Sequence, residues 1–352
     1  MVKILMKGNE AMAEAAVMSG CRYYFGYPIT PQNEVTAYMA KRLPEVGGVF
    51  LQAESEVSAI NMVYGAGGAG GRVMISSSSP GISLMQEGIS YIAGAEIPCV
   101  IVNVMRGGPG LGNITAAQSD YLQATKGGGH GDYHLIVLAP ASVQEIADMM
   151  DKAFDLADKY RNPVMVLMDG ILGQMMEPVE FKEKLSEELP VKQKDWATTG
   201  MRDREKPNLI TSLYIEPEAL EQHNYRLKEK YDRIKQNEVM YEEFNIEGAE
   251  IVIVAYGITS RIAKTAISMA SKEGLRVGLI RPITLWPFPY KAFDNLDVKA
   301  LLTVEMSLEQ MYEDVLLASN GRIPVHFLGR PGGVVIEPAE IVNKVKSILG
   351  RY

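Results

Sequence analysis

Short runs of consecutive apolar residues alternate with longer segments of helical periodicity along the first half of the chain. The runs that we expect to form strands are residues 21–26, 49–52, 72–76, 99–104, 135–138 and 164–168. The segments that we expect to form helices are residues 7–19, 32–42, 53–64, 82–93 and 143–159. Strands that alternate with helices pair in parallel, and buried parallel strands are almost uniformly apolar. The pattern therefore predicts an α/β fold with a doubly wound, mostly parallel sheet.

Charged residues dominate the middle of the chain. Residues 180–188 and 225–233 carry both signs of charge, which is typical of a solvated linker and a charged helix. After residue 250 we again expect strands at 250–257, 277–280, 301–304 and 325–328, helices at 260–272 and 309–317 with a final one after them, and a turn at 286–289. We therefore predict an α/β domain at residues 1–190, a charged linker and helix at 191–246, and a second, smaller α/β domain at 247–352.

The composition is ordinary for a globular protein, with 47% hydrophobic and 22% charged residues among 352. The net charge of −8 comes without a basic stripe, which argues against nucleic acid as a partner. No apolar run approaches the roughly 20 residues of a membrane span, and the N-terminal residues do not resemble a signal peptide. Cys21 and Cys99 lie far apart in apolar surroundings. We expect buried free thiols and a cytoplasmic protein.

Residues 65–70 match the letters of the G-x-G-x-x-G dinucleotide-binding motif. In that motif the glycines follow a strand and open a helix, whereas here they follow an expected helix and precede the expected strand 72–76. Close helix packing and a C-terminal helix stop explain these glycines better than a nicotinamide site does. An NAD(P)-dependent dehydrogenase is therefore kept only as a rival hypothesis.

Three polar residues follow the ends of expected strands: Thr30, Glu56 and Arg106. Open α/β sheets bind ligands at this edge. Each residue also has a structural explanation: a proline-rich turn for Thr30, a favourable helix dipole for Glu56, and a salt bridge for Arg106. Glu54 lies about 200° around a helix from Glu56, so only one of the two can face a given pocket. Together, a carboxylate, a hydroxyl and a guanidinium favour one binding cleft.

Three segments carry a family resemblance: Tyr27-Pro28-Ile29-Thr30-Pro31, Glu54-Ser55-Glu56 with Ile60-Asn61, and Met105-Arg106-Gly107-Gly108-Pro109. In this order and spacing they resemble the α subunit of the 2-oxoacid:ferredoxin oxidoreductases, the thiamine-diphosphate enzymes of anaerobic metabolism. The resemblance runs essentially end to end. Residues 1 to about 190 look like that family's pyrimidine-binding domain, and residues from about 247 to 352 look like its transketolase-C-terminal-like domain.

The resemblance implies a role for each of these residues. Glu56 matches the glutamate that hydrogen-bonds N1′ of the cofactor's aminopyrimidine, which favours the imino tautomer that removes the thiazolium proton. Pro28 and Ile29 are expected cofactor contacts in the same site. Arg106 matches a residue that pairs with the carboxylate of the 2-oxoacid, and Thr30 matches one that adds a hydroxyl donor.

Part of the expected machinery is missing from this sequence. Proteins that bind thiamine diphosphate hold it through Mg²⁺ on a Gly-Asp-Gly segment with a downstream Asn pair, and Gly131-Asp132-Tyr133 lacks the second glycine. Only Arg161-Asn162 lies near the expected distance, which we interpret as coincidence, so no metal ligand is assigned. The resemblance therefore implies a β subunit carrying the diphosphate, Mg²⁺ and an iron–sulfur cluster, further γ- and δ-type subunits, and ferredoxin as electron acceptor.

The glycine-rich segments at 79–81 and 106–109, and the length of the chain, look most like the 2-ketoisovalerate (branched-chain) group of the family. The implied reaction is oxidative decarboxylation of a branched-chain 2-oxoacid with coenzyme A, giving acyl-CoA, CO₂ and reduced ferredoxin. The alternatives are 2-oxoglutarate or pyruvate as substrate, because a hydrophobic pocket separates such side chains by only a few kcal/mol. A non-catalytic α/β binding protein is the alternative outside this family.

Overall fold

The computed structural model of the chain describes residues 3–181, 194–201 and 204–351. The expected boundary between residues 190 and 191, and most of the charged run at 180–188, lie outside these ranges. Within the described ranges, no helix combines the length and the apolar character needed to cross a lipid bilayer.

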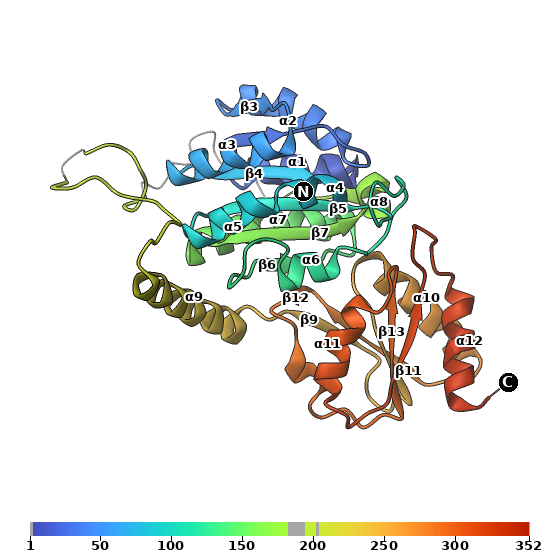
Figure 1. The fold of residues 1–352 in the computed structure, drawn as a ribbon. Coiled ribbons are helices and arrows are strands. Elements are labelled where there is room, and N and C mark those ends of the chain that lie inside the picture. Colours follow the sequence, from blue (N-terminus) through green and yellow to red (C-terminus); the bar gives the residue numbers. More distant parts are fainter. Residues whose placement is uncertain (1–2, 182–193, 202–203, 352) are drawn as a thin grey trace.

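The larger sheet formed by the described residues has seven strands and lies in the upper half of Figure 1. Its order is β12 (Thr284–Trp286), β6 (Ile136–Leu138), β7 (Pro163–Asp169), β5 (Cys99–Met105), β4 (Val73–Ser77), β2 (Tyr23–Gly26) and β3 (Val49–Gln52). Every neighbouring pair is parallel except β12 and β6. The central strands β5 and β7 are buried along their whole length, as their nearly continuous apolar sequence predicts. The doubly wound, mostly parallel sheet is confirmed.

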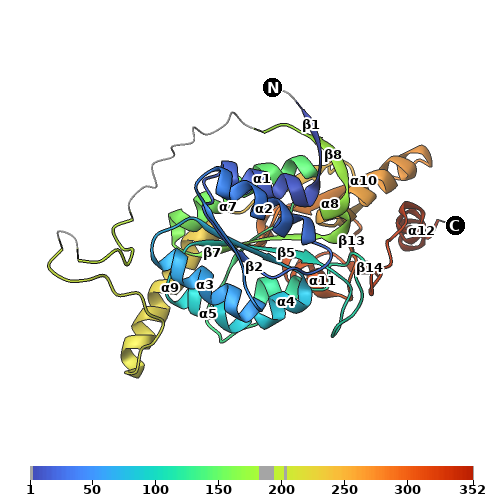
Figure 2. The same cartoon turned by 90° about the horizontal axis from the view of Figure 1, so that it is seen from above.

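Helices cover both faces of this sheet (Figure 2). One face carries α1 (Gly8–Met18), α2 (Asn33–Glu45) and α7 (Val143–Tyr160), and the other carries α3 (Glu56–Gly68), α4 (Ser79–Leu84) and α5 (Gln86–Gly94). The short helices are α6 (Tyr121–Lys126) and α8 (Gly170–Gln174). A separate antiparallel pair joins β1 (Ile4–Lys7) to β8 (Met176–Val179). Both cysteines are buried free thiols, as expected.

The second sheet belongs to the C-terminal part of the chain. Its order is β14 (Val325–Gly329), β13 (Ala300–Glu305), β10 (Ile251–Val254), β11 (Val277–Pro282) and β9 (Tyr241–Phe244), with only β9 antiparallel. The helices α10 (Gly257–Lys272) and α12 (Pro338–Leu349) lie on one side, and α11 (Gln310–Ser319) lies on the other (Figure 1). The charged helix expected before this sheet is α9 (Pro217–Asn237), which packs on the larger unit.

Two of the expected helices have different bounds. The helix expected at 82–93 begins earlier, because α4 starts at Ser79 with a proline in its first turn, a favoured position for proline. The single helix expected at 82–93 is divided at Met85 into α4 and α5. The expected turn 286–289 follows directly from a short strand that was not predicted, β12, which ends at Trp286 and pairs with β6. The helix expected from residue 53 begins only at Glu56, because Ser55 caps it by accepting a hydrogen bond from the Ser58 amide.

Glycines 65–70 have the structural role expected from the sequence. Residues 65–68 form the last turn of α3, and β4 follows them. A Cβ at Gly67 would stand 2.5 Å from Cγ2 of Ile97, and Gly70 has a φ of +92° just beyond the helix. These glycines therefore serve close packing and the helix stop.

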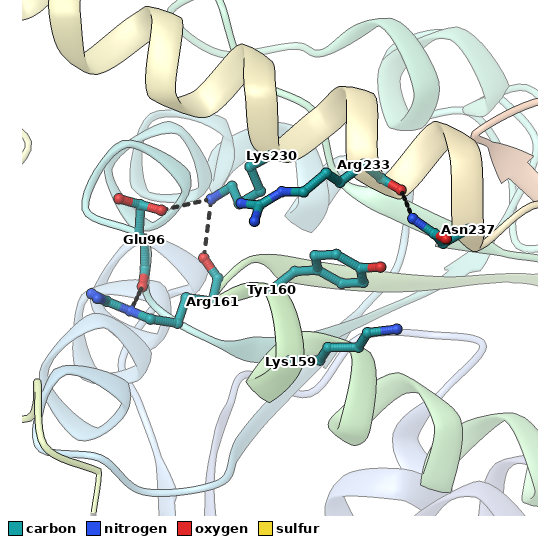
Figure 3. A pocket seen from close by; sticks show the side chains of 7 residues that line it. All are labelled: Glu96, Lys159, Tyr160, Arg161, Lys230, Arg233 and Asn237. Carbon is teal, nitrogen blue, oxygen red and sulfur yellow. Dashed lines mark hydrogen bonds and ion pairs between the residues drawn. The ribbon is translucent and has the colours of Figure 1, made fainter.

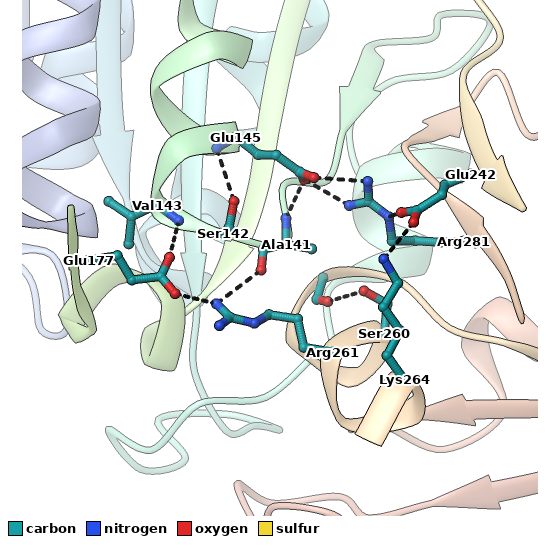
Figure 4. A network of polar contacts seen from close by, with 11 residues as sticks. Ala141, Ser142, Val143, Glu145, Glu177, Glu242, Ser260, Arg261, Lys264 and Arg281 are labelled. Atoms are coloured by element: carbon teal, nitrogen blue, oxygen red, sulfur yellow. Dashed lines mark hydrogen bonds and ion pairs between the residues drawn. The ribbon is translucent and has the colours of Figure 1, made fainter. Parts of the chain in front are cut away.

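A group of paired charges joins the two sheets (Figure 4). We name it the inter-sheet network; it consists of Glu145, Arg281, Glu242 and Lys264. Arg281 on β11 is buried and donates to both carboxylate oxygens of Glu145 on α7, at 2.7 and 3.0 Å. Its Nε donates to Glu242 at 2.8 Å, and Glu242 also accepts from Lys264 at 2.5 Å. Bidentate guanidinium–carboxylate contacts are strong and directional, so they fix how the sheets meet.

Candidate active site

The carboxyl ends of four neighbouring strands bring the expected site residues to one edge of the larger sheet. The strands β5, β4, β2 and β3 are adjacent in that order and run parallel. Arg106 follows β5, Ser77 ends β4, Thr30 lies shortly after β2, and Glu56 lies shortly after β3. We call this region the carboxyl edge. It is where open α/β sheets bind ligands.

Arg106 and Thr30 are in direct contact. The guanidinium of Arg106 donates from Nη1 to the main-chain carbonyl of Thr30 at 3.0 Å, and from Nη2 to the carbonyl of Leu111 at 3.1 Å. Arg106 is 7% exposed, and its Nε is buried without a partner among the described residues. The Thr30 hydroxyl oxygen accepts a hydrogen bond from Asn33 at 3.3 Å. The contact between the two residues therefore uses the Thr30 carbonyl. The Thr30 hydroxyl interacts instead with Asn33 at the start of α2.

Glu56 is the first residue of α3 and is 6% exposed. Its carboxylate lies against Gly81: a Cβ at that position would stand 2.5 Å from Oε1 of Glu56 and 2.1 Å from Oγ of Ser77. Only glycine leaves room there, so the glycine at 81 allows the carboxylate and the Ser77 hydroxyl to approach the same point. The first turn of a helix also favours a negative charge at this position.

The two neighbouring glutamates behave differently, as their spacing predicts. Glu54 is exposed and its carboxylate accepts hydrogen bonds from the hydroxyls of Ser55 and Ser58. Those hydrogen bonds lower the pKa of Glu54, the one from Ser58 most. Glu56 turns inward instead. The pair thus contains one surface carboxylate and one buried carboxylate at the carboxyl edge.

A second carboxylate at this edge was not predicted from the sequence. Asp120 accepts hydrogen bonds from Ser79 at 2.5 Å and Asn103 at 2.8 Å, and burial raises its pKa despite these donors. The same Ser79 hydroxyl oxygen accepts from the Arg106 amide at 3.1 Å. The serines that directly follow β4 indicate a polar site at the end of that strand. No local pattern connects Ser79 to Asp120, which lies 41 residues later.

The loop after Arg106 is held by the C-terminal part of the chain. The side-chain amide of Asn113 donates to the carbonyl of Gly332 at 2.8 Å, and the Gly107 amide donates to the carbonyl of Thr115 at 2.9 Å. A Cβ at Gly107 would stand 2.6 Å from Oδ1 of Asn113. The glycine-rich sequence therefore lets two segments from different sheets pack closely beside the guanidinium.

The residues at the carboxyl edge fit part of an aminopyrimidine cofactor but not its metal. Glu56 supplies a buried carboxylate, and Ser77 beside it has a buried hydroxyl without a partner among the described residues. No group of three or more metal-ligating side chains occurs in the described part of the chain. Asp132 is exposed, and Asn162 uses its amide to donate to the carbonyls of His134 and Pro163.

Comparison with known proteins assigns the fold to a family. Residues 14–243 match the family described as pyruvate flavodoxin/ferredoxin oxidoreductase, thiamine diphosphate-binding. Residues 249–341 match the one described as pyruvate:ferredoxin oxidoreductase core domain II. The chain is 53% identical to ketoisovalerate oxidoreductase subunit VorB of Methanothermobacter marburgensis over 98% of both chains. It is 39% identical to 2-oxoglutarate synthase subunit KorA of the same organism, over 97% of this chain and 98% of the other.

Solved structures agree with this assignment. A 2-oxoglutarate:ferredoxin oxidoreductase from Magnetococcus marinus, solved with 2-oxoglutarate, coenzyme A and succinyl-CoA bound, superposes with a TM-score of 0.88 at 29% identity. The match covers 99% of this chain but 65% of that one, so this chain spans about two thirds of its length. A split-gene transketolase, at 16% identity and a TM-score of 0.62, shares the fold. The chain belongs to the family of thiamine-diphosphate-dependent 2-oxoacid:ferredoxin oxidoreductases, as an α-type subunit of a multi-subunit enzyme.

Proposed function

We propose that this chain is the α subunit of an enzyme that oxidatively decarboxylates a branched-chain 2-oxoacid, 2-ketoisovalerate, with coenzyme A, giving acyl-CoA, CO₂ and reduced ferredoxin. The observation that carries the choice of substrate is the difference in identity: 53% to a ketoisovalerate oxidoreductase subunit against 39% to a 2-oxoglutarate synthase subunit of one organism. The neighbour solved with 2-oxoglutarate keeps that oxoacid as the second candidate.

Glu56, with Pro28 and Ile29, is proposed to hold the aminopyrimidine of thiamine diphosphate. When bound, this cofactor supplies a nucleophilic carbon and an electron sink for decarboxylation. A buried carboxyl that hydrogen-bonds a ring nitrogen shifts the proton balance of that ring, and burial beside Gly81 holds the Glu56 carboxyl in a fixed position. Its neighbour Ser77 offers a hydroxyl to the same point.

Arg106 is proposed to bind the carboxylate of the 2-oxoacid. A guanidinium has five N–H donors, and the contacts to Thr30 and Leu111 use only two of them. The remaining donors can pair with a carboxylate, while the two carbonyls hold the guanidinium plane in place. The Thr30 hydroxyl, which accepts from Asn33, still has its proton to donate to substrate.

The chain is proposed to act only with partners in the cytoplasm. We assign the diphosphate, its Mg²⁺ and an iron–sulfur cluster to a β subunit, with γ- and δ-type subunits completing the path to ferredoxin. Residues 1–190 are proposed as the pyrimidine-binding domain and residues 247–352 as the transketolase-C-terminal-like domain. The support is the absence of a metal-ligating cluster among the described residues and the family to which the chain belongs.

The test is purification of the native complex and assay against 2-ketoisovalerate, 2-oxoglutarate and pyruvate with coenzyme A and a low-potential acceptor. We expect the highest kcat/KM with 2-ketoisovalerate, and no thiamine-dependent decarboxylation by this chain alone. A higher kcat/KM with 2-oxoglutarate would overturn the substrate assignment. Decarboxylation by the isolated chain would overturn the shared active site.

The Arg106→Ala variant tests the carboxylate contact in the same complex. Loss of charge-assisted hydrogen bonds should raise KM for the 2-oxoacid about 10- to 100-fold with a smaller change in kcat. Lys41→Ala removes an exposed positive charge from α2 and serves as the control. Unchanged saturation by the 2-oxoacid in Arg106→Ala would contradict the role of Arg106.

A further inference from the structure

A cavity of about 550 Å³ lies at the opposite end of the larger sheet from the carboxyl edge (Figure 3). Its lining residues are Glu96, Lys159, Tyr160, Arg161, Lys230, Arg233 and Asn237. Glu96 precedes β5, and residues 159–161 end α7 just before β7, so the cavity lies at the amino ends of these strands. The seven residues of β7 separate the two ends by roughly 20 Å. The cavity is therefore distinct from the site that contains Arg106.

Positive charge dominates this cavity. Four of its lining residues are cations and only Glu96 is an anion. Lys159 is paired at 2.6 Å with Glu238, which is not one of the lining residues. Lys230, which is 3% exposed, donates to Glu96 and to the carbonyl of Arg161, both at 3.2 Å. Of the lining residues, Glu96 is thus the one carboxylate near three cations, Arg161, Lys230 and Arg233, in a chain whose net charge is −8.

Two guanidinium groups at this cavity are free to bind a ligand. Arg161 uses Nε to donate to the carbonyl of Glu96 at 3.2 Å, and its Cζ lies 4.5 Å from the ring centroid of Trp196. No side-chain partner for its terminal nitrogens, or for the guanidinium of Arg233, occurs among the described residues. Burial lowers the pKa of Lys230. The positive charges of Arg161 and Arg233 also lower it, whereas the negative charge of Glu96 raises it. Like charges held together in this way are stabilised by a bound anion.

The cations approach the cavity from different elements. Lys230 and Arg233 extend from α9, whereas Arg161 and Lys159 come from the end of α7 on the other side (Figure 3). A tetrahedral anion accepts hydrogen bonds from several directions, whereas a carboxylate is satisfied by one planar guanidinium. Tyr160 adds an aromatic ring to the lining, and the volume is within the range of small-molecule sites.

We propose that this cavity binds the phosphate group of a small phosphorylated molecule, and we call it the α9 phosphate site. Lys230 is the buried cation at its base, Arg161 is half-buried beside it, and Arg233 lies on the solvent side. This site lies outside the decarboxylation machinery and does not depend on which 2-oxoacid the enzyme uses. The ligand is either free phosphate or a phosphorylated compound with a ring that packs on Tyr160.

Trp196 provides a direct readout, because Arg161 lies over its ring and the chain has only two tryptophans. Inorganic phosphate, AMP and succinate are titrated into the complete chain, alone and in its native complex, with tryptophan fluorescence and calorimetry. We expect saturable binding of phosphate or AMP that weakens with added salt. Tighter binding of AMP than of phosphate identifies a ring-bearing ligand, and equal affinity identifies free phosphate. Equal binding of succinate, or no saturable binding of either phosphate compound, overturns the proposal.

Arg233→Gln is the diagnostic variant, because Arg233 is exposed and its loss leaves the core unchanged. We expect its affinity for the bound phosphate compound to fall about tenfold, the cost of one charge-assisted contact. Lys228→Gln removes an equal charge from the same helix outside this cavity and should change affinity less than about twofold. Equal losses in the two variants would show a general charge effect and overturn the site.

Discussion

The carboxyl edge and the inter-sheet network each contain a buried arginine, yet the two regions satisfy its polar atoms differently. In the network, Arg281 makes three hydrogen bonds to two glutamates, and Lys264 completes the pairing (Figure 4). At the carboxyl edge, or beside it at the end of β7, the buried polar atoms without partners among the described residues include Arg106 Nε, Ser77 Oγ, Ser78 Oγ, Asn103 Oδ1 and Asp169 Oδ2.

This difference separates polar groups that hold the fold from polar groups kept for another purpose. Most buried polar atoms in proteins have hydrogen-bond partners, and each exception lowers stability. In a complete network such as that of Arg281, the buried polar groups have a structural role, because they fix the geometry between the elements that they join. Two of the exceptions at the carboxyl edge, Arg106 Nε and Ser77 Oγ, belong instead to residues that we propose for the substrate and cofactor contacts.

The largest effect that would test this contrast is on catalysis. Glu56→Gln keeps the size of the side chain but removes the acid, so we expect the rate of the complex to fall about 10²- to 10⁴-fold with little change in unfolding. The measurement is exchange of the C2 proton of bound thiamine diphosphate together with turnover. Glu54→Gln is the matched control and should leave both unchanged. Equal effects of the two substitutions would show that the buried carboxylate has no special role.

Much of the fold was predictable because its strands are locally encoded. The run at 49–52 coincides with β3, and the runs at 99–104 and 301–304 lie within β5 and β13. The edge strands β9 and β12 were missed, because each has only three or four residues and is ordered by antiparallel pairing with a distant strand. The prolines after β12 correctly indicated a turn, but no local signal indicated the short strand before it, which depends on tertiary pairing.

The site was predictable only in part, for a similar reason. The positions of Thr30, Glu56 and Arg106 follow from strand ends, since all parallel strands finish at one edge. The contact between Arg106 and the Thr30 carbonyl spans 76 residues, and no local pattern specifies which atom of Thr30 is used. The hydrogen bond from Ser79 to Asp120 likewise depends on how the start of α4 and the start of α6 pack after the fold has formed.

The next effect concerns stability at the inter-sheet network. Arg281→Met leaves Glu145 and Glu242, which are about one third exposed, without the guanidinium that pairs them, so we expect the free energy of unfolding to fall by about 2 to 3 kcal/mol. Urea unfolding followed by circular dichroism measures this change, and kcat of the complex below the transition should be unaffected.

Arg276→Met is the matched control for this substitution. Arg276 lies just before β11 and is 68% exposed in its side chain, with a single 3.9 Å ion pair to Glu250. Its loss should change stability by less than about 0.5 kcal/mol. If Arg281→Met were equally harmless, the network would not hold the two sheets together, and the contrast with the carboxyl edge would disappear.

The smallest effect concerns Asp169, which ends β7 next to the carboxyl edge. Its Oδ1 accepts hydrogen bonds from the amides of Ile171 and Leu172 at 2.9 and 3.1 Å, whereas Oδ2 is buried without a partner among the described residues. Burial raises the pKa of Asp169 from 3.8 to about 6, and the amide donors oppose this only partly. The unfolded chain therefore releases this proton near pH 4, and the folded chain releases it near pH 6.

The sign of the pH dependence follows from these two pKa values. Below pH 4 the carboxyl is neutral in both states, and above pH 6 the folded state buries a charge, so stability falls as pH rises from 4 to 6. A shift of about two pKa units corresponds to at most about 3 kcal/mol. Asp169→Asn keeps the Oδ1 acceptor and has no proton to lose. The stability of this variant should therefore lack the decrease between pH 4 and pH 6 that comes from Asp169. Denaturation midpoints of the two proteins across pH 4 to 8 should diverge with rising pH; parallel curves would show that the unpaired oxygen at this edge carries no charge that the fold must accommodate.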